Sequence, residues 1–306
     1  MSESESNYAE AVVEAAGMVT RRVKARAVLV YEHALPDPVV ACRALSASGC
    51  GVILIRHAGD PPHGDLGKHV RFLEVPDFKL TRMDQIKMAT LIAFSQRLLN
   101  TTDTFVALTG VTSQPLDTLV VMKVGAEYEL FQSVDQPKIT EHVRRVVFQR
   151  VLTIALELAQ EGREGRPVGA LFVIGSDREL SKYMAQNIIN PFHGYTQKQR
   201  NILDDAMRNT VKEFAAIDGA FVIKGNGVIV SAGTTLRAGL GEETLPQGLG
   251  TRHAAAAAIT ASTRSIAITV SESTGTVRLW RRGKMITELE QAPRTPTPQV
   301  GMQDSP

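Results

Sequence analysis

Three short polar segments in the second half of the chain carry side chains that could bind phosphate. They are Gly250-Thr251-Arg252-His253, Asp218-Gly219-Ala220 and Ser271-Glu272-Ser273-Thr274-Gly275. The first opens an alanine run typical of a helix, and backbone N–H groups at a helix start attract anions. Gly250 leaves room for a phosphate, Arg252 adds a planar charged fork and Thr251 adds a neutral donor. This segment predicts a polyphosphate site.

Carboxylate and imidazole groups accompany the predicted phosphate site. Asp218 ends a helical pattern and directly precedes a strand, so we expect its carboxylate at a strand-edge crevice, where α/β sheets commonly hold ligands. His253 can donate a hydrogen bond or bind a metal, depending on which nitrogen carries the proton. With Glu272, which follows a buried strand, these two residues are potential ligands of a divalent cation. The residues alone predict a nucleotide site with a metal and do not name the reaction.

The bulk composition is that of an ordinary globular protein. The chain has 306 residues, of which 43% are hydrophobic and 22% charged, and its formal net charge is +2. This length suffices for two domains with separate cores. So small a net charge gives no global attraction to nucleic acid or acidic lipid, and any anion binding must come from local geometry.

No segment predicts export or membrane insertion. Met1 to Ser6 are polar and acidic, unlike the basic start and apolar centre of a signal peptide. No apolar run approaches the roughly 20 residues of a membrane helix. Cys42 and Cys50 are too few for a disulfide framework and are interpreted as packing residues. We expect a soluble, cytoplasmic protein.

Residues 7–135 predict one α/β domain. Strand and helix patterns alternate along them, which favours a parallel sheet covered on both faces. Helical patterns cover 8–23, 39–46 and 83–99. The expected strands are 27–31, 52–55, 70–75, 105–108 and 119–124.

Residues 136–290 predict a second α/β domain, joined to the first by a linker at 133–138. Apolar residues recur every three or four positions from Val143 to Leu158, so a long amphipathic helix opens this domain. A second helix follows with Asp204 or Asp205 as its N-cap. The tail at 291–306 holds four prolines and is expected to be disordered. Further strands are expected at 168–174, 220–224, 228–232, 266–271, 276–280 and 285–289.

The three polar segments, in this order, resemble the signature of diadenylate cyclases, the family of the nucleotide-binding domain of the DNA-integrity-scanning protein. Asn190-Pro191-Phe192-His193-Gly194-Tyr195 and Asn201-Ile202-Leu203-Asp204 add matching context. The resemblance covers roughly residues 140–290 and is specific, because three ordered motifs match rather than one glycine-rich loop. It implies a mixed central sheet flanked by helices and synthesis of cyclic di-AMP from two ATP molecules, with release of two pyrophosphates.

The resemblance also implies a role for each motif residue. Asp218 would sit beside a Mn²⁺ or Mg²⁺ ion and the attacking 3′-hydroxyl, and Gly219 and Ala220 would lie against the nucleotide. Leu236 would line the adenine pocket. In the family, two domains face each other and each 3′-hydroxyl attacks the other ATP, so the resemblance implies a homo-oligomer. Phosphates and metal would be held by Gly250, Thr251, Arg252, His253, Ser271 and Glu272, with Asp218, Arg252 and His253 as the catalytic residues and Asp218, His253 and Glu272 as the metal ligands.

Residues 7–135 more weakly resemble the C-terminal domain of pyruvate kinase, which one class of diadenylate cyclases carries in front of the cyclase domain. Neither the DNA-binding part of the scanning protein nor a membrane anchor is expected in this class.

One position departs from the family pattern. Many members carry a second arginine after the histidine, where this chain has Ala254. The change removes a cation from the phosphate site, and Lys224, Arg237 and Arg264 are candidates to replace it. It also leaves open the alternative of a catalytically silent protein that binds ATP or cyclic di-AMP.

Overall fold

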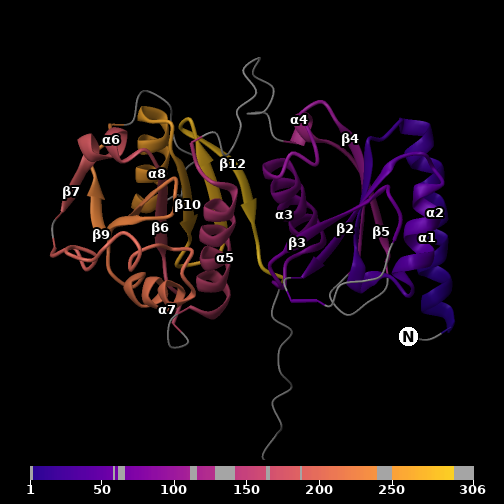
Figure 1. The fold of residues 1–306 in the computed structure, drawn as a ribbon, viewed down its shortest axis with the longest axis horizontal. Helices are drawn as coiled ribbons and strands as arrows, with labels where there is room; N and C mark the ends of the chain where they lie inside the picture. The colour runs from indigo at the N-terminus through magenta and orange to yellow at the C-terminus, as the bar shows by residue number, and fades with distance from the viewer. Residues whose placement is uncertain are drawn as a thin grey trace, which may run out of the picture.

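The computed structural model describes residues 3–57, 59–60, 66–110, 116–127, 142–162, 166–186, 188–239 and 250–292. These residues form two β-sheets, each flanked by helices, so the predicted α/β fold class is confirmed (Figure 1). The predicted linker at 133–138 lies outside the described residues. So does the predicted disordered tail, apart from Gln291 and Ala292.

The N-terminal sheet has the strand order β3-β2-β1-β4-β5. Strands β1 to β4 are parallel, whereas β5 pairs antiparallel with β4. The expected all-parallel sheet is therefore wrong for its last strand. Only residues 110–117 connect β4 to β5, fewer than the dozen or so that a parallel crossover needs. The bounds are β1 (Ala27–Tyr31), β2 (Gly51–His57), β3 (Val70–Val75), β4 (Thr104–Thr109) and β5 (Thr118–Lys123).

Helices cover both faces of this sheet. Helices α1 (Glu3–Val23) and α2 (Pro38–Ser46) lie on one side and α3 (Arg82–Ser95) lies on the other (Figure 1). Helix α2 begins where Asp37 accepts hydrogen bonds from the N–H groups of the following turn, as an N-cap does. The short elements are η1 (Glu32–Ala34) and α4 (Val124–Glu127).

The second sheet has the order β12-β11-β10-β6-β8-β9-β7 and is mixed, as the resemblance implied. Strands β6 and β8 are parallel neighbours at its centre, and the other pairs are antiparallel. The bounds are β6 (Ala170–Gly175), β7 (Met184–Gln186), β8 (Ala220–Lys224), β9 (Ile229–Leu236), β10 (Ile266–Val270), β11 (Val277–Arg281) and β12 (Lys284–Leu289).

Alternate residues of the central strands face different helices, as the two-residue period of a strand requires. Phe172 and Ile174 of β6 belong to the core that includes α5 (Arg145–Glu161). Leu171 and Val173 belong to a second core with Trp280 and α8 (Thr251–Ser262). Asp204 caps α7 (Asp205–Phe214), which confirms one of the two predicted caps. The remaining short elements are α6 (Asp177–Leu180) and η3 (Ser181–Tyr183).

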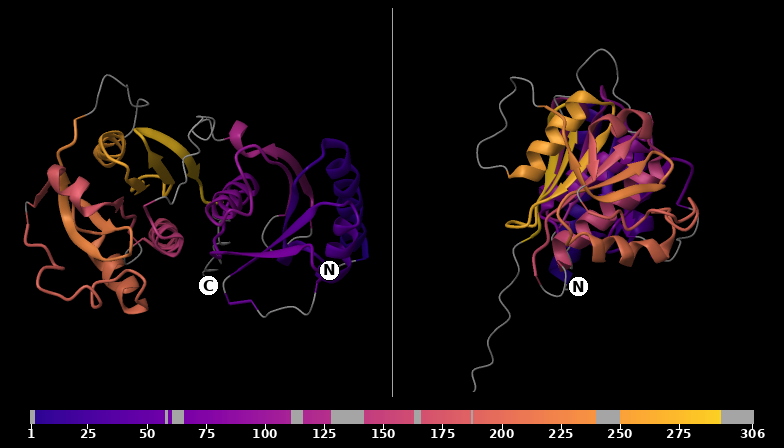
Figure 2. Two further views of the ribbon diagram at one scale, coloured as in Figure 1. Left: turned by 45° about the horizontal axis from the view of Figure 1, so that its top comes forward. Right: turned by 90° about the vertical axis from the view of Figure 1, so that its left-hand side faces the viewer.

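The two sheets lie side by side, with α3 and β12 between them (Figure 2). Just after β12, Gln291 forms an isolated bridge with Leu80, and the Ala292 N–H donates to the Lys79 carbonyl at 2.9 Å. Arg145, at the start of α5, donates to the Gln96 carbonyl at 3.2 Å. A side-chain contact at the start of the second unit and backbone contacts at its end therefore hold it against the first.

Candidate active site

The three polar segments meet at one edge of the second sheet. Asp218 and Gly219 directly precede β8, and Gly169 precedes its parallel neighbour β6. Strand β10 runs antiparallel to β6, so Ser271 and Glu272, which follow β10, return to the same edge. Helix α8 also begins there. The site therefore lies where β6 and β8 start.

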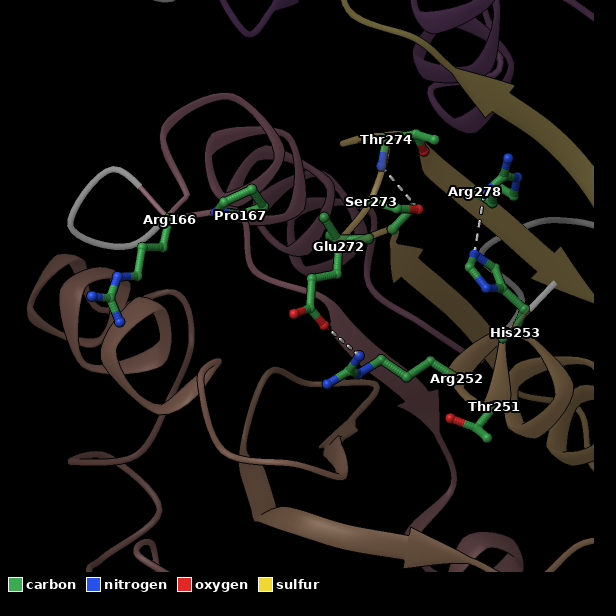
Figure 3. Close-up of a pocket in the computed structure, with 12 residues that line it drawn as sticks. Arg166, Pro167, Thr251, Arg252, His253, Glu272, Ser273, Thr274 and Arg278 are labelled. Carbon is green, nitrogen blue, oxygen red and sulfur yellow. Dashed lines mark hydrogen bonds and ion pairs between the residues drawn. The ribbon is translucent and has the colours of Figure 1, made fainter. Parts of the chain in front are cut away.

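A cavity of about 790 Å³ occupies this edge (Figure 3). Six of the ten predicted site residues line it: Gly250, Thr251, Arg252, His253, Ser271 and Glu272. Its other lining residues are Arg166, Pro167, Val270, Ser273, Thr274 and Arg278.

Arg252 connects the motifs. Its Nη1 donates to a Glu272 carboxylate oxygen at 3.3 Å and its Nη2 to Asp218 at 3.5 Å. Both contacts are long, and the two carboxylates are 62% and 97% exposed. Gly169 makes room for this guanidinium, since a Cβ there would lie 2.6 Å from Nη1. Arg252 is thus loosely held, half-buried and free to exchange its carboxylate partners for a phosphate.

The Asp218-Gly219 turn presents an open carboxylate on a rigid backbone. Gly219 has φ +114°, and a Cβ on it would lie 2.6 Å from the Gly233 carbonyl carbon. Only glycine fits this turn without strain. Ala220, the next residue, is buried in β8, and Leu236 pairs with Met184 at the end of β9. These two residues, Asp218 and Gly219 are not among the residues that line the cavity.

His253 lies at the other side of the cavity, only 6% exposed. An Arg278 Nη1–H donates to its Nε2 at 3.2 Å, because a guanidinium has no acceptor. Burial, then the charges of Arg278 and Arg252, lower the pKa of His253 to about 4. The imidazole is therefore neutral at pH 7, with its proton on Nδ1, which has no partner among the described residues.

The predicted metal ligands do not form one cluster. Within the described ranges, no three carboxylate, imidazole or thiol groups gather as a metal site. Asp218 and Glu272 share Arg252, whereas the Nε2 of His253 faces a guanidinium, which repels a metal cation. Of the three, Asp218 has the most exposed side chain, and the choice of metal ligands stays a prediction.

The structure adds residues that the motifs did not indicate. Arg278 contacts His253, and Arg166 lines the cavity near Arg252. Arg278 stands in β11 between Val277 and Leu279, both buried. An arginine inside a buried strand was the sequence signal that could have indicated it.

The three candidates for the missing cation lie elsewhere. Lys224 pairs with Asp177 at 2.7 Å, and Arg264 pairs with Glu179. The exposed Arg237 continues β9, its N–H bonded to the Tyr183 carbonyl. None of the three lines the cavity.

Comparisons with known proteins show the family of the chain. The family described as DisA bacterial checkpoint controller nucleotide-binding matches residues 157–285. A protein of Haloferax volcanii named diadenylate cyclase is 35% identical over 225 residues, which cover 72% of this chain and 80% of the relative. The chain belongs to the diadenylate cyclase family.

A second diadenylate cyclase, from Methanocaldococcus jannaschii, is 36% identical over 206 residues, or 65% of this chain. The chain spans 63% of the length of that relative. Among solved structures, DacA from Staphylococcus aureus is 22% identical over 45% of this chain and 83% of its own, with a TM-score of 0.30. A pyruvate kinase from Cryptosporidium parvum is 13% identical over 38% of this chain and 23% of its own, with a TM-score of 0.28.

In the part of the chain that the structure describes, no helix combines the length and apolar character needed to cross a bilayer.

Proposed function

We propose that this protein is a diadenylate cyclase, which condenses two ATP molecules into cyclic di-AMP and releases two pyrophosphates. The observation that carries the proposal is the Arg252 guanidinium, which lines the cavity at the start of α8 and contacts the Asp218 carboxylate at 3.5 Å. Membership of the family supplies the reaction, since its relatives are named for it.

The cavity has the charge of a triphosphate site. Three guanidinium groups line it, from Arg166, Arg252 and Arg278, against one carboxylate, from Glu272. Gly250 is the N-cap of α8 and provides no side chain to the first-turn N–H groups. The His253 N–H already donates to the Gly250 carbonyl, whereas the N–H groups of Thr251 and Arg252, with the Thr251 hydroxyl, are available to phosphate oxygens. The helix dipole favours the negative charge.

The reaction needs in-line attack with both nucleotides held in place. A 3′-hydroxyl oxygen forms a bond to an α-phosphorus, the bond from that phosphorus to the β-phosphate oxygen breaks, and pyrophosphate leaves. In this proposal Asp218 orients the hydroxyl and accepts its proton. Arg252 moves from the two carboxylates to the α-phosphate, where it balances the developing charge.

A divalent cation, Mn²⁺ or Mg²⁺, belongs to this proposal with Asp218 as its protein ligand. Mg²⁺ is commonly held by one or two carboxylates together with substrate phosphates and water, so a single exposed aspartate suits it. When bound, the cation would neutralise phosphate charge and lower the pKa of the hydroxyl.

In this proposal each copy of the chain holds one ATP. A cavity of about 790 Å³ lies in the range that holds one nucleotide-sized ligand. A ring of two nucleotides therefore requires two cavities face to face, most simply across a two-fold axis between copies. We include this homo-oligomeric contact in the proposal.

Incubation of the purified chain with ATP and Mg²⁺ or Mn²⁺, followed by chromatography of the nucleotides, tests the function. We expect cyclic di-AMP and pyrophosphate in a ratio of one to two, and no cyclic product from 3′-deoxy-ATP. ATP binding with no cyclic dinucleotide in either metal would instead identify a regulatory protein that binds the nucleotide without turnover.

A further inference from the structure

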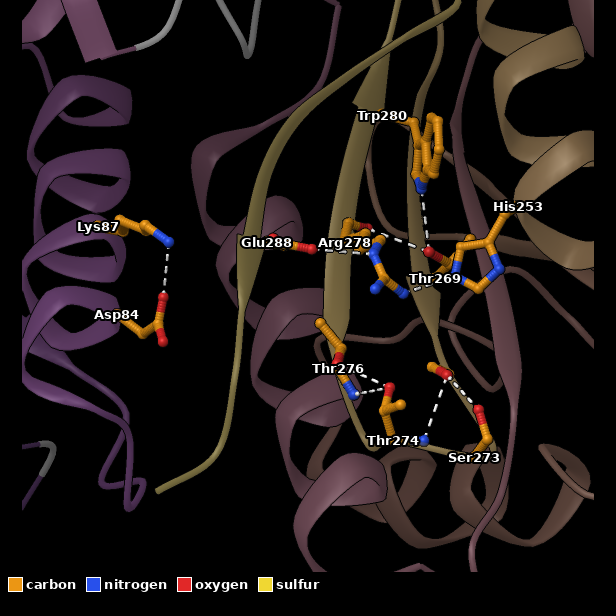
Figure 4. Close-up of polar contacts among 11 residues, drawn as sticks. Asp84, Lys87, His253, Thr269, Ser273, Thr274, Thr276, Arg278, Trp280 and Glu288 are labelled. Atoms are coloured by element: carbon orange, nitrogen blue, oxygen red, sulfur yellow. Dashed lines mark hydrogen bonds and ion pairs between the residues drawn. The ribbon is translucent and has the colours of Figure 1, made fainter. Parts of the chain in front are cut away.

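Arg278 is held in place on both sides of its guanidinium. Its Nε donates to Glu288 on the neighbouring strand β12 at 3.2 Å, and its Nη1 donates to the neutral His253 at 3.2 Å (Figure 4). The side chain is 15% exposed. Such a fixed, mostly buried guanidinium loses little conformational entropy when it binds a further group.

Most of its hydrogen-bonding capacity is unused. A guanidinium has five N–H donors, and these two contacts use two of them, which leaves three. No partner for the three exists among the described residues, and Arg278 lines the cavity. A buried cation with open donors beside a cavity favours an anion there, because a charge is felt more strongly away from water.

Arg278 and Arg252 occupy different sides of the same cavity. Figure 3 shows the Arg252–Glu272 contact on one side and the Arg278–His253 contact on the other. Arg252 reaches the cavity from α8 and Arg278 from β11. The two cations therefore come from separate elements and face a common space.

We propose that Arg278 is a second triphosphate-binding arginine, which holds the phosphate chain from the side opposite Arg252. Glu288 and His253 are its positioning residues. This inference rests on the proposed nucleotide site and deepens it.

Calorimetric binding of ATP, inorganic triphosphate and adenosine to the full chain tests the inference. We expect Arg278→Gln to weaken ATP and triphosphate binding by roughly 10- to 100-fold, the worth of a charged hydrogen-bonded contact. Adenosine affinity should stay unchanged, because the base and ribose do not contact Arg278. Lys284→Gln removes a cation from the same hairpin outside the cavity and should change none of the three affinities.

Arg278→Lys gives a second, milder measurement if the glutamine variant fails to fold. The lysine keeps the positive charge and lacks the planar set of guanidinium donors, so triphosphate affinity should fall by about 3- to 10-fold. Adenosine affinity should again be unchanged. Equal affinity of the lysine or glutamine variant and the unmodified chain for triphosphate would overturn the inference. A parallel loss of adenosine binding would also overturn it, because that would indicate a structural role.

The two proposals fail separately. If the unmodified chain forms cyclic di-AMP and Arg278→Gln binds triphosphate normally, the function stands and the role of Arg278 falls. If triphosphate binding depends on Arg278 and no cyclic product forms, the site stands and the cyclase function falls.

Discussion

The two ends of the central strands β6 and β8 carry cavities of similar size, and the cations that line them differ in exposure and in their partners. The cavity at their starts measures about 790 Å³ and contains the family motifs. The cavity at their far ends measures about 690 Å³ and is richer in cations. That second cavity is lined by Arg97, His142, Arg144, Arg145, Lys224 and Arg264, among others.

The larger number of cations at the far cavity does not make it the better anion site, because these cations are paired or exposed. At the far ends, Lys224 has an Asp177 oxygen at 2.7 Å, and Arg264 binds Glu179 through its Nε at 3.0 Å and its backbone N–H at 3.1 Å. These Arg264 hydrogen bonds lower the pKa of Glu179. The other arginines there are exposed.

At the strand starts, by contrast, Arg252 and Arg278 are 28% and 15% exposed. Arg252 makes only long contacts, and Arg278 has open donors. Partly buried guanidinium groups with unused N–H donors form an anion site. An exposed guanidinium attracts an anion weakly because solvent screens its charge, and a paired one because a nearby carboxylate already balances that charge.

The largest expected difference between the two ends is catalytic. Asp218→Asn should lower the rate of cyclic di-AMP formation by about 1,000-fold, as loss of a proton acceptor and cation ligand does. Because Asp218 is 97% exposed, the variant should unfold at the same urea concentration as the parent chain. Asp177→Asn, at the far end, should keep its rate within about 2-fold of the parent; an equal loss in both variants would remove the distinction.

A fall in pH should destabilise the folded protein through His253, which lines the cavity at the starts of β6 and β8. The pKa of His253 is about 4 in the folded chain and about 6.5 when unfolded. As the pH falls below 6.5, the unfolded state gains a proton that the folded state does not, so His253 lowers the free energy of unfolding. The loss develops between pH 6.5 and 4 and is on the order of 3 kcal/mol.

Urea unfolding at a series of pH values measures this dependence. His253→Gln should flatten the profile between pH 6.5 and 4. His142→Gln, which removes an exposed imidazole at the far cavity, is the matched control for the loss of a histidine. An unchanged profile in the His253 variant would contradict the burial of a neutral imidazole.

Substitution by alanine should change the folding free energy by different amounts at Gly219 and Gly250, two glycines of the family motifs. Gly219→Ala should cost about 2–3 kcal/mol of folding free energy, since φ is +114° and the new Cβ would overlap β9 backbone. A Cβ at Gly250 would have no atom within 4 Å, so Gly250→Ala should change the folding free energy by less than about 0.5 kcal/mol. Thermal or urea unfolding compares them, and equal stability would contradict the close approach of the Asp218 turn to β9.

The smallest expected effect concerns substrate affinity. Arg252→Gln should raise the KM for ATP by about 10- to 30-fold, because a charged hydrogen-bonded contact to phosphate is lost, and should also lower kcat, because Arg252 balances the charge that develops in the transition state. Arg264→Gln removes an arginine at the far end that already has a carboxylate partner, and its KM should be unchanged. Steady-state kinetics of both variants checks this; a raised KM in the Arg264 variant would assign the nucleotide to the other cavity.

The motif residues were predictable because each has a local signature: a glycine before a helix, an aspartate before a strand, a hydroxyl-rich turn after one. Arg278 was not, because its role comes from the pairing of β11 with β10 and β12, which brings it beside His253. The direction of β5 depended on the length of its connection rather than on its alternating residues.

The metal ligands illustrate the same limit. Residue types suggested Asp218, His253 and Glu272 together, but only side-chain directions reveal that guanidinium groups lie against all three. The three-residue strand β7 (Met184–Gln186) escaped prediction because so short a segment has no readable alternation.

A crystal structure of the full chain with 3′-deoxy-ATP and Mn²⁺ would locate the nucleotide, since this nucleotide lacks the hydroxyl that cyclises. We expect a triphosphate between Arg252 and Arg278, at the start of α8, with the ribose beside Asp218 and a second copy facing it. A nucleotide bound among Arg144, Lys224 and Arg264 instead, with the motif cavity empty, would contradict this expectation.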